Sequence, residues 1–215
     1  MAKYPPIPER LRKIDDLTRS DHFHLCQEDD CYYLWEWDAE PYAVSATTDF
    51  IGNFQRDMRF KDSHWPWHFK RMAIIHAAKA IAQTMLPEWN RSTFVPVPPS
   101  KVRDHPRHDP RLISTLLVPV PNLNGLDVRE LVVQITNTQS REKHISPLAR
   151  AANWALDQSI VNPAPSHIVV FDDLLTGGSH FAGMKIVLGR AFPGVPVAGL
   201  FLARRLCLSV QDPSV

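Results

Sequence analysis

The sequence of 215 residues has few cysteines, almost no excess charge and no long apolar run. Its three cysteines, Cys26, Cys31 and Cys207, provide no disulfide framework. A formal net charge of +1 gives no general attraction to nucleic acid or to acidic membranes. No segment has the length of a membrane span, and the first residues lack the apolar core of a secretory signal. These absences predict a soluble cytoplasmic protein that does not associate with membranes.

Composition divides the chain into two parts. Residues 31–60 carry short aromatic and β-branched runs that are interrupted by Pro41, Asp49 and Gly52. This pattern predicts a small antiparallel sheet or a long hairpin. We therefore expect residues 1–65 to form a β-rich segment that serves as a hood or binds a partner, and residues 66–215 to form the core.

The second part alternates between helical and strand patterns. Met72, Ile75, Ala78, Ala82 and Met85 recur at helical spacing. Further helices are expected after an Asp109 cap, over 146–158 and after residue 179, and strands over 92–99, 128–136, 167–171 and 195–205. Such alternation predicts an α/β fold, Rossmann-like, in which helices cover both faces of a parallel sheet and ligands bind at the carboxyl ends of the strands.

The most informative stretch, FDDLLTGGSH, spans residues 171–180. The pattern predicts that a buried strand ends at the acidic pair and that a turn leads at once into a helix. Backbone amides at the start of that helix suit an anion. The stretch lacks both the lysine of a Walker loop and the Gly-x-Gly-x-x-Gly of a dinucleotide turn.

This order of apolar residues, two acidic residues, two apolar residues and a small-residue loop resembles the signature of type I phosphoribosyltransferases. The resemblance implies that Asp172 and Asp173 contact the ribose hydroxyls. It implies a 5′-phosphate loop made of Thr176, Gly177, Gly178, Ser179 and His180. Gly177 and His180 depart from the hydroxyl residues common in the family, which favours weaker or pH-dependent phosphate binding.

Two further loops extend the resemblance over about the C-terminal two thirds of the chain. The stretch FVPVPPSKVRDHPRHDPRL, residues 94–112, is similar to the first core strand and pyrophosphate loop of the ComF-like branch. There the matching positions are Ser100, Lys101 and Arg103. Residues 136–154 stand where the family carries a mobile catalytic loop, and would supply Arg141, Lys143 and His144. Solvated surface loops are the alternative interpretation of both stretches.

Two functions remain open from these residues. The first is transfer of phosphoribosyl from phosphoribosyl pyrophosphate, with Mg²⁺, to a nitrogen nucleophile that the sequence does not identify; no general base is evident. The second is a catalytically silent module that senses a nucleotide or scaffolds a partner. Small proteins of similar pattern accompany bacterial retron (phage-defence) systems, so a protein or ribonucleoprotein partner is included, and self-association is left open.

The acidic pair also carries an expectation about stability. Two like charges side by side are tolerated only if hydroxyls, a metal or solvent compensate them. Changing Asp172 and Asp173 to Asn is therefore expected to abolish ribose-phosphate binding and to leave stability unchanged or raised.

Two other clusters carry weaker signals. His22, His24, Cys26 and Cys31 are ligand types for zinc, but they lack a Cys-x-x-Cys pair. A nucleic-acid site is suggested by the basic residues near Trp65 and Trp67, but Asp57 and Asp62 interrupt the run. Those basic residues are Arg56, Arg59, Lys61, Lys70 and Arg71.

Overall fold

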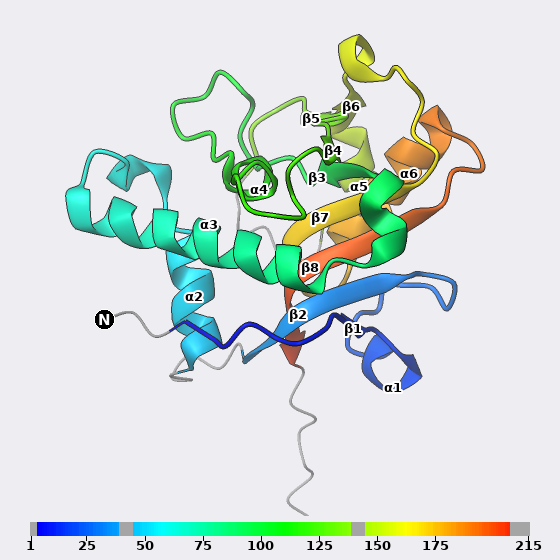
Figure 1. The fold of residues 1–215 in the computed structure, drawn as a ribbon. Coiled ribbons are helices and arrows are strands. Elements are labelled where there is room, and N and C mark those ends of the chain that lie inside the picture. Colours follow the sequence, from blue (N-terminus) through cyan, green and yellow to red (C-terminus); the bar gives the residue numbers. More distant parts are fainter. Residues whose placement is uncertain (1–3, 39–44, 139–144, 207–215) are drawn as a thin grey trace, which may run out of the picture.

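The computed structural model describes residues 4–38, 45–138 and 145–206. Its main sheet has six strands in the order β1-β2-β8-β7-β3-β4. These are β1 (Arg12–Lys13), β2 (Cys31–Asp38), β3 (Thr93–Pro96), β4 (Asp127–Val128), β7 (Ile168–Leu175) and β8 (Val197–Leu206). Every neighbouring pair is parallel except β1 with β2. The molecule is therefore α/β with a mixed, mostly parallel sheet (Figure 1).

The described residues contain six helices and three 3₁₀ turns. They are α1 (Asp16–Arg19), α2 (Ala46–Phe54), α3 (His64–Thr84), α4 (Arg111–Leu116), α5 (Pro147–Ala152) and α6 (Ser179–Ala191), with 3₁₀ turns η1 (Met58–Phe60), η2 (Pro87–Arg91) and η3 (Gln158–Ile160). α2 packs against α3, and α5 packs against α6. Figure 1 shows the two pairs at different sides of the strands. Among the described residues, no helix is both long and apolar enough to cross a membrane.

The apolar periodicity of α3 and α6 is confirmed as helical. In α6, Phe181, Met184 and Leu188 are fully buried, and the Phe181 ring meets the Phe201 ring of β8 edge-on. α3 begins at His64, earlier than its apolar spacing indicated. The N-cap of α4 is Pro110 and not the expected Asp109, although the Asp109 Oδ1 accepts from the Arg111 N–H at the start of the helix.

The expectation of an antiparallel sheet or hairpin over residues 31–60 is wrong. β2 instead joins the main sheet in parallel with β8, from Cys31 opposite Gly199 to Asp38 opposite Leu206. Residues 46–54 form α2, because the Ser45 hydroxyl accepts from the Thr48 N–H and caps a helix there. Whether residues 1–65 form a unit of their own stays a prediction, but their longest strand belongs to the common sheet.

The expected strand 128–136 and helix 146–158 are each divided. Only Asp127–Val128 pair with β3, whereas β5 (Val132–Gln134) pairs with β6 (Trp154–Leu156) in a separate antiparallel sheet. The helix ends at Ala152 because Trp154 is buried and its Nε1 donates to the Gln134 Oε1 at 2.7 Å. Burial of this one side chain turns the chain from helix to strand.

β7 lies at the centre of the sheet and is longer than its apolar run. Pairing with β8 continues through Asp172 opposite Phe201 and Leu175 opposite Arg204. The acidic pair therefore lies inside the strand and does not end it. On its other side β7 pairs with β3, with Pro96 opposite Phe171. The carboxyl ends of β3 and β7 are thus neighbours, and the loops that follow them begin at one edge of the sheet.

Candidate functional site

The candidate site begins with the loop that follows β3. The Val97 N–H donates to the Phe171 carbonyl at 2.9 Å, which holds the start of this loop against β7. Further along, the Thr138 N–H donates to the Ser100 carbonyl at 2.8 Å, and the Lys101 Nζ donates to the Thr138 carbonyl at 2.7 Å. The structure thus brings the expected pyrophosphate loop to the segment that leads into residues 139–144. Arg141, Lys143 and His144 themselves lie outside the described residues.

Arg103 is directed at carboxylates next to β5 and β6. Its Nη1 lies 2.9 Å from the Asp157 Oδ2, and its Nη2 lies 3.5 Å from the Glu130 Oε2. Lys101 and Arg103 help to line a small cavity of about 10 Å³, together with His108 and Glu130. That volume holds about one water molecule. A pyrophosphate group at these residues would therefore need the loop to move outward.

The glycine loop after β7 has the geometry of a helix start. Gly178 adopts φ +85°, a left-handed conformation that favours glycine, and α6 begins at the next residue, Ser179. The Ser179 hydroxyl accepts from the Arg150 Nε of α5 at 2.9 Å. A guanidinium therefore lies at the amino end of α6, where the helix dipole also favours an anion. No local sequence pattern predicts Arg150 at this position, because the contact arises from packing between α5 and α6.

An N-terminal segment, residues 22–25, lies directly on this loop; we call it the strap. The buried His22 ring donates from Nδ1 to the Thr176 carbonyl, and the His24 N–H donates to the Gly177 carbonyl at 2.9 Å. A Cβ on Gly177 would lie 2.7 Å from the Phe23 ring, and one on Gly178 would lie 2.9 Å from the Leu25 side chain. Close approach of the strap is therefore one reason for glycine at both positions. Burial lowers the pKa of His22, which favours the neutral ring.

Asp172 forms a pair with His180, in the first turn of α6. Its Oδ2 lies 2.8 Å from the His180 Nδ1, and its Oδ1 accepts from the Asp173 N–H at 2.8 Å. Asp172 is only 3% exposed, and burial raises its pKa, although the His180 partner opposes the shift. This contact gives His180 a structural explanation: it is the partner of the first carboxylate of the acidic pair.

Asp173 forms a different ion pair. The Arg111 Nε and Nη2 donate to its Oδ2 at 2.9 and 2.6 Å, and the Gln55 amide donates to the same oxygen at 3.0 Å. Burial alone would raise the pKa of Asp173, but the Arg111 charge and these hydrogen bonds outweigh it and hold that pKa below its usual value. The two neighbouring carboxyls therefore have pKa values shifted in opposite directions.

The pair of Asp173 and Arg111 continues into a chain of alternating charges. The Arg111 Nη1 lies 3.0 Å from the Asp109 Oδ2, which in turn lies 2.8 Å from the Lys70 Nζ. The Lys70 side chain is 1% exposed and also donates to the carbonyls of Phe54 and Arg56. All three ammonium protons thus have acceptors, as burial of this charge requires. This chain of charges ties α2, α3 and α4 to the end of β7.

These contacts contradict the expectation that hydroxyls, a metal or solvent compensate the acidic pair. Successive strand residues point to opposite faces of a sheet, and the two carboxylates accordingly meet partners from different helices. Each carboxylate is paired with a side chain of the protein itself. Sequence patterns did not identify Gln55 and Arg111 as partners of Asp173, and they placed Lys70 among the basic residues of the possible nucleic-acid site.

Metal ligands do not gather in the described part of the chain. No three His, Cys, Asp or Glu side chains lie close enough there to hold an ion. Cys31 is buried with its Sγ against Gly199, and Cys26 is exposed. The side chains of Asp172 and Asp173 are almost completely buried, so a resident Mg²⁺ would have little access to their oxygens. The residues therefore do not fit a built-in magnesium site, and a magnesium ion would have to arrive with a phosphorylated ligand.

No protein-family model matches the chain, and no curated protein matches it.

Proposed function

We propose that this chain is a phosphoribosyltransferase-like protein that binds phosphoribosyl pyrophosphate or a nucleoside 5′-monophosphate. Its core would then be of the type I phosphoribosyltransferase kind. The observation that carries the proposal is the placement of β7, its glycine loop and α6 directly beside β3 and the loop of Ser100 and Lys101. A ligand site at the carboxyl edge between adjacent parallel strands is the usual arrangement in α/β proteins.

The 5′-phosphate would lie at the start of α6. Backbone N–H groups of Gly178, Ser179 and His180 supply donors, and the Arg150 guanidinium supplies charge-assisted hydrogen bonds. Lys101 would exchange its Thr138 carbonyl for a pyrophosphate oxygen, since an ammonium donates more strongly to an anion than to a carbonyl. Magnesium carried by pyrophosphate would neutralise further charge.

Ribose hydroxyls would meet Asp172 and Asp173. Each Asp172 oxygen has one partner and can accept a second hydrogen bond, whereas a hydroxyl at the Asp173 Oδ2 would have to displace one of its three donors. Their side chains are 4% and 7% exposed, so the site must open locally before a sugar reaches them. Movement of the strap or of the loop after β3 would provide that access.

A second candidate function is supported by the ion pairs of the two aspartates. His180 and Arg111 already satisfy the carboxylates without a ligand. This arrangement suits a catalytically silent module that senses a nucleotide or scaffolds a protein or ribonucleoprotein partner, such as the components of a retron system. Turnover separates this candidate from a transferase, because both bind the nucleotide.

Calorimetry with phosphoribosyl pyrophosphate and with nucleoside monophosphates, each with and without Mg²⁺, tests the proposal. Arg150→Gln should weaken both ligand types. Arg190→Gln, an exposed position in the last turn of the same helix, is the matched control and should change neither. No binding of any of these ligands at millimolar concentration would overturn the proposal.

A second comparison concerns the pyrophosphate loop. Changing Lys101 and Arg103 together to Ala should weaken phosphoribosyl pyrophosphate far more than a monophosphate. Equal losses would show that these cations act only through the general electrostatic field. Release of pyrophosphate with a panel of nitrogen nucleophiles then distinguishes a transferase from a silent module.

A further inference from the structure

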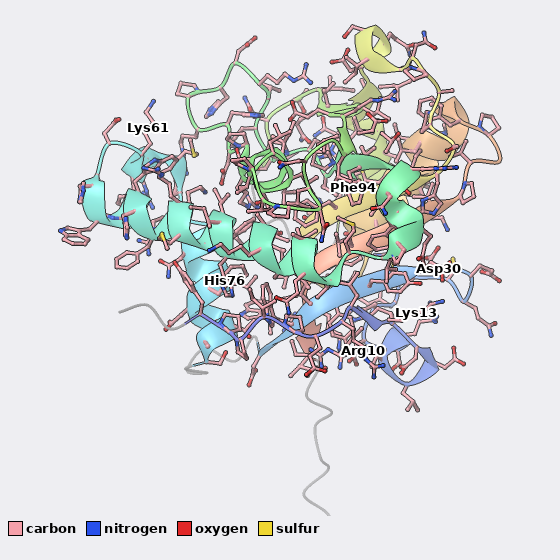
Figure 2. All side chains as sticks on the ribbon, viewed as in Figure 1. Arg10, Lys13, Asp30, Lys61, His76 and Phe94 are labelled. Atoms are coloured by element: carbon pink, nitrogen blue, oxygen red, sulfur yellow. The ribbon has the colours of Figure 1, made fainter. Side chains whose placement is uncertain are left out.

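A groove outside the candidate site combines cations with aromatic rings. It lies at the amino end of α3 and has a volume of about 260 Å³. Its lining side chains are Lys61, Asp62, His64, Trp67, His68 and Arg71. Figure 2 shows Lys61 at this end of the molecule, directed away from the body of the protein.

The structure separates the basic residues of this region into two groups. Lys70 is buried on Asp109, Arg59 lies 3.7 Å from Asp57, and the Arg56 Nη2 donates to Asn53. In contrast, Lys61 and Arg71 are exposed, and no carboxylate within the described ranges forms an ion pair with either. These two cations are therefore available to an anionic ligand in the groove.

Trp67, His64 and His68 line the groove, and Trp65 lies outside this lining but contacts both histidines. Trp65 is 66% exposed, and its ring centre lies 5.2 Å from that of His64 and 6.3 Å from that of His68. A tryptophan buries more apolar surface than most side chains, so leaving one this exposed forgoes substantial stabilisation. Met72, two turns farther along α3, is 41% exposed. The exposed Trp65 ring can stack on another planar ring.

We propose that this groove binds single-stranded nucleic acid. Phosphates would lie at Lys61 and Arg71, and bases would stack on Trp65 and the neighbouring histidines. Proteins bind single strands by combining cationic side chains, which contact the phosphate backbone, with aromatic rings on which the bases stack. This combination does not require base-specific contacts. A duplex keeps its bases stacked on one another and offers Trp65 no face. An acidic peptide would use the cations but leave the rings without partners.

Fluorescence anisotropy with labelled oligo-dT and oligo-U tests this proposal. Affinity should fall steeply as salt rises, because each neutralised phosphate releases counterions. Lys61→Glu combined with Arg71→Glu should weaken binding by at least about tenfold and reduce the salt slope by about two charges. Trp65→Ala should cost about tenfold through lost stacking.

Lys79→Glu is the matched control, because Lys79 is exposed farther along α3. It should leave the affinity close to that of the unchanged protein. Circular dichroism establishes that every variant is folded.

Three results would overturn the proposal. They are salt-independent or absent binding of single strands, equal losses in the groove variants and in Lys79→Glu, and equal affinity for polyglutamate competitors. The groove variants should bind phosphoribosyl pyrophosphate unchanged. A failure to bind single strands therefore does not affect the proposed function. A failure to bind phosphoribosyl pyrophosphate likewise does not affect the proposal for the groove.

Discussion

Asp172 and Asp173 show that neighbours in the chain, both buried, can differ in their partners and in the direction of their pKa shifts. One is paired with a half-exposed histidine, and the other with an arginine that belongs to a chain of alternating charges. The pKa of Asp172 is raised and that of Asp173 is lowered. Single substitutions are therefore more informative than the double substitution, because the two effects oppose each other.

Asp173→Asn should destabilise the protein by about 3 kcal/mol, because it leaves the Arg111 guanidinium without a full countercharge in a mostly buried site. A carboxyl whose pKa is lowered on folding contributes stability that is present above its unfolded pKa and lost as the pH falls through the folded pKa. The loss should therefore be largest above pH 3.8, the usual pKa, and shrink in acid. Urea unfolding across a pH series measures it, and a neutral or stabilising effect near pH 7 would contradict the ion-pair account.

Asp172→Asn should show the opposite pH dependence. A carboxyl whose pKa is raised on folding holds its proton more tightly in the folded state, so the stability of the unchanged protein falls as the pH rises from 3.8 through the folded pKa. Asparagine does not ionise. The stability of the variant relative to the unchanged protein should therefore increase with pH over that interval in the same unfolding series. A difference that does not vary with pH would show that His180 fully compensates the charge.

At the scale of elements, the glycine loop and the strap depend on each other. The loop forms the start of α6, and the strap holds its carbonyls through His22 and His24. The two positions need glycine for different reasons. Of the two, only Gly178 has a positive φ, a backbone conformation that disfavours residues with a side chain. Gly177 is constrained by Phe23 alone, whose side chain is 73% exposed and can rotate away.

Gly178→Ala should destabilise the protein by about 1–2 kcal/mol from the left-handed backbone, and further through the contact with Leu25. Gly177→Ala is the matched comparison and should cost less than about 1 kcal/mol. Thermal melts measure both. Adding Phe23→Ala to Gly177→Ala should remove most of the remaining cost and leave that of Gly178→Ala unchanged. Equal costs for the two glycines would refute the distinction.

At the scale of the whole molecule, β2 connects the N-terminal part to the core. It covers β8 along most of its length and contributes the buried Cys31, Leu34 and Trp35. Without β2, β8 becomes an exposed apolar edge strand, which favours aggregation. The strap adds a second connection from the same part of the chain.

A fragment of residues 66–215 should therefore fail to unfold cooperatively or should aggregate. Coexpression with residues 1–65 should restore a soluble complex with a cooperative melt, because the missing strand is then supplied in trans. Circular dichroism melts and gel filtration of the fragment, the complex and the full chain provide the comparison. A cooperative melt of 66–215 alone would support an independent core.

Several features of the fold were predictable from local patterns. The helical spacing in α3 and α6, the apolar run of β7 and the alternation of elements all lie within short windows of sequence. Such windows contain the periodicity of a helix or strand and the residues that cap it. For the candidate site, this predicted that a strand, a glycine loop and a helix follow one another over residues 168–191.

The sequence by itself determined those elements and the order in which they occur. Tertiary structure alone decided that β2 lies beside β8, that the strap lies on the glycine loop, and that Gln55 and Arg111 reach Asp173 across 118 and 62 residues of chain. Parallel pairing and buried ion pairs join distant segments, so no local spacing contains them. The aspartates could be found from sequence, but their charge state and access depend on which distant side chains the packed core brings within hydrogen-bonding distance.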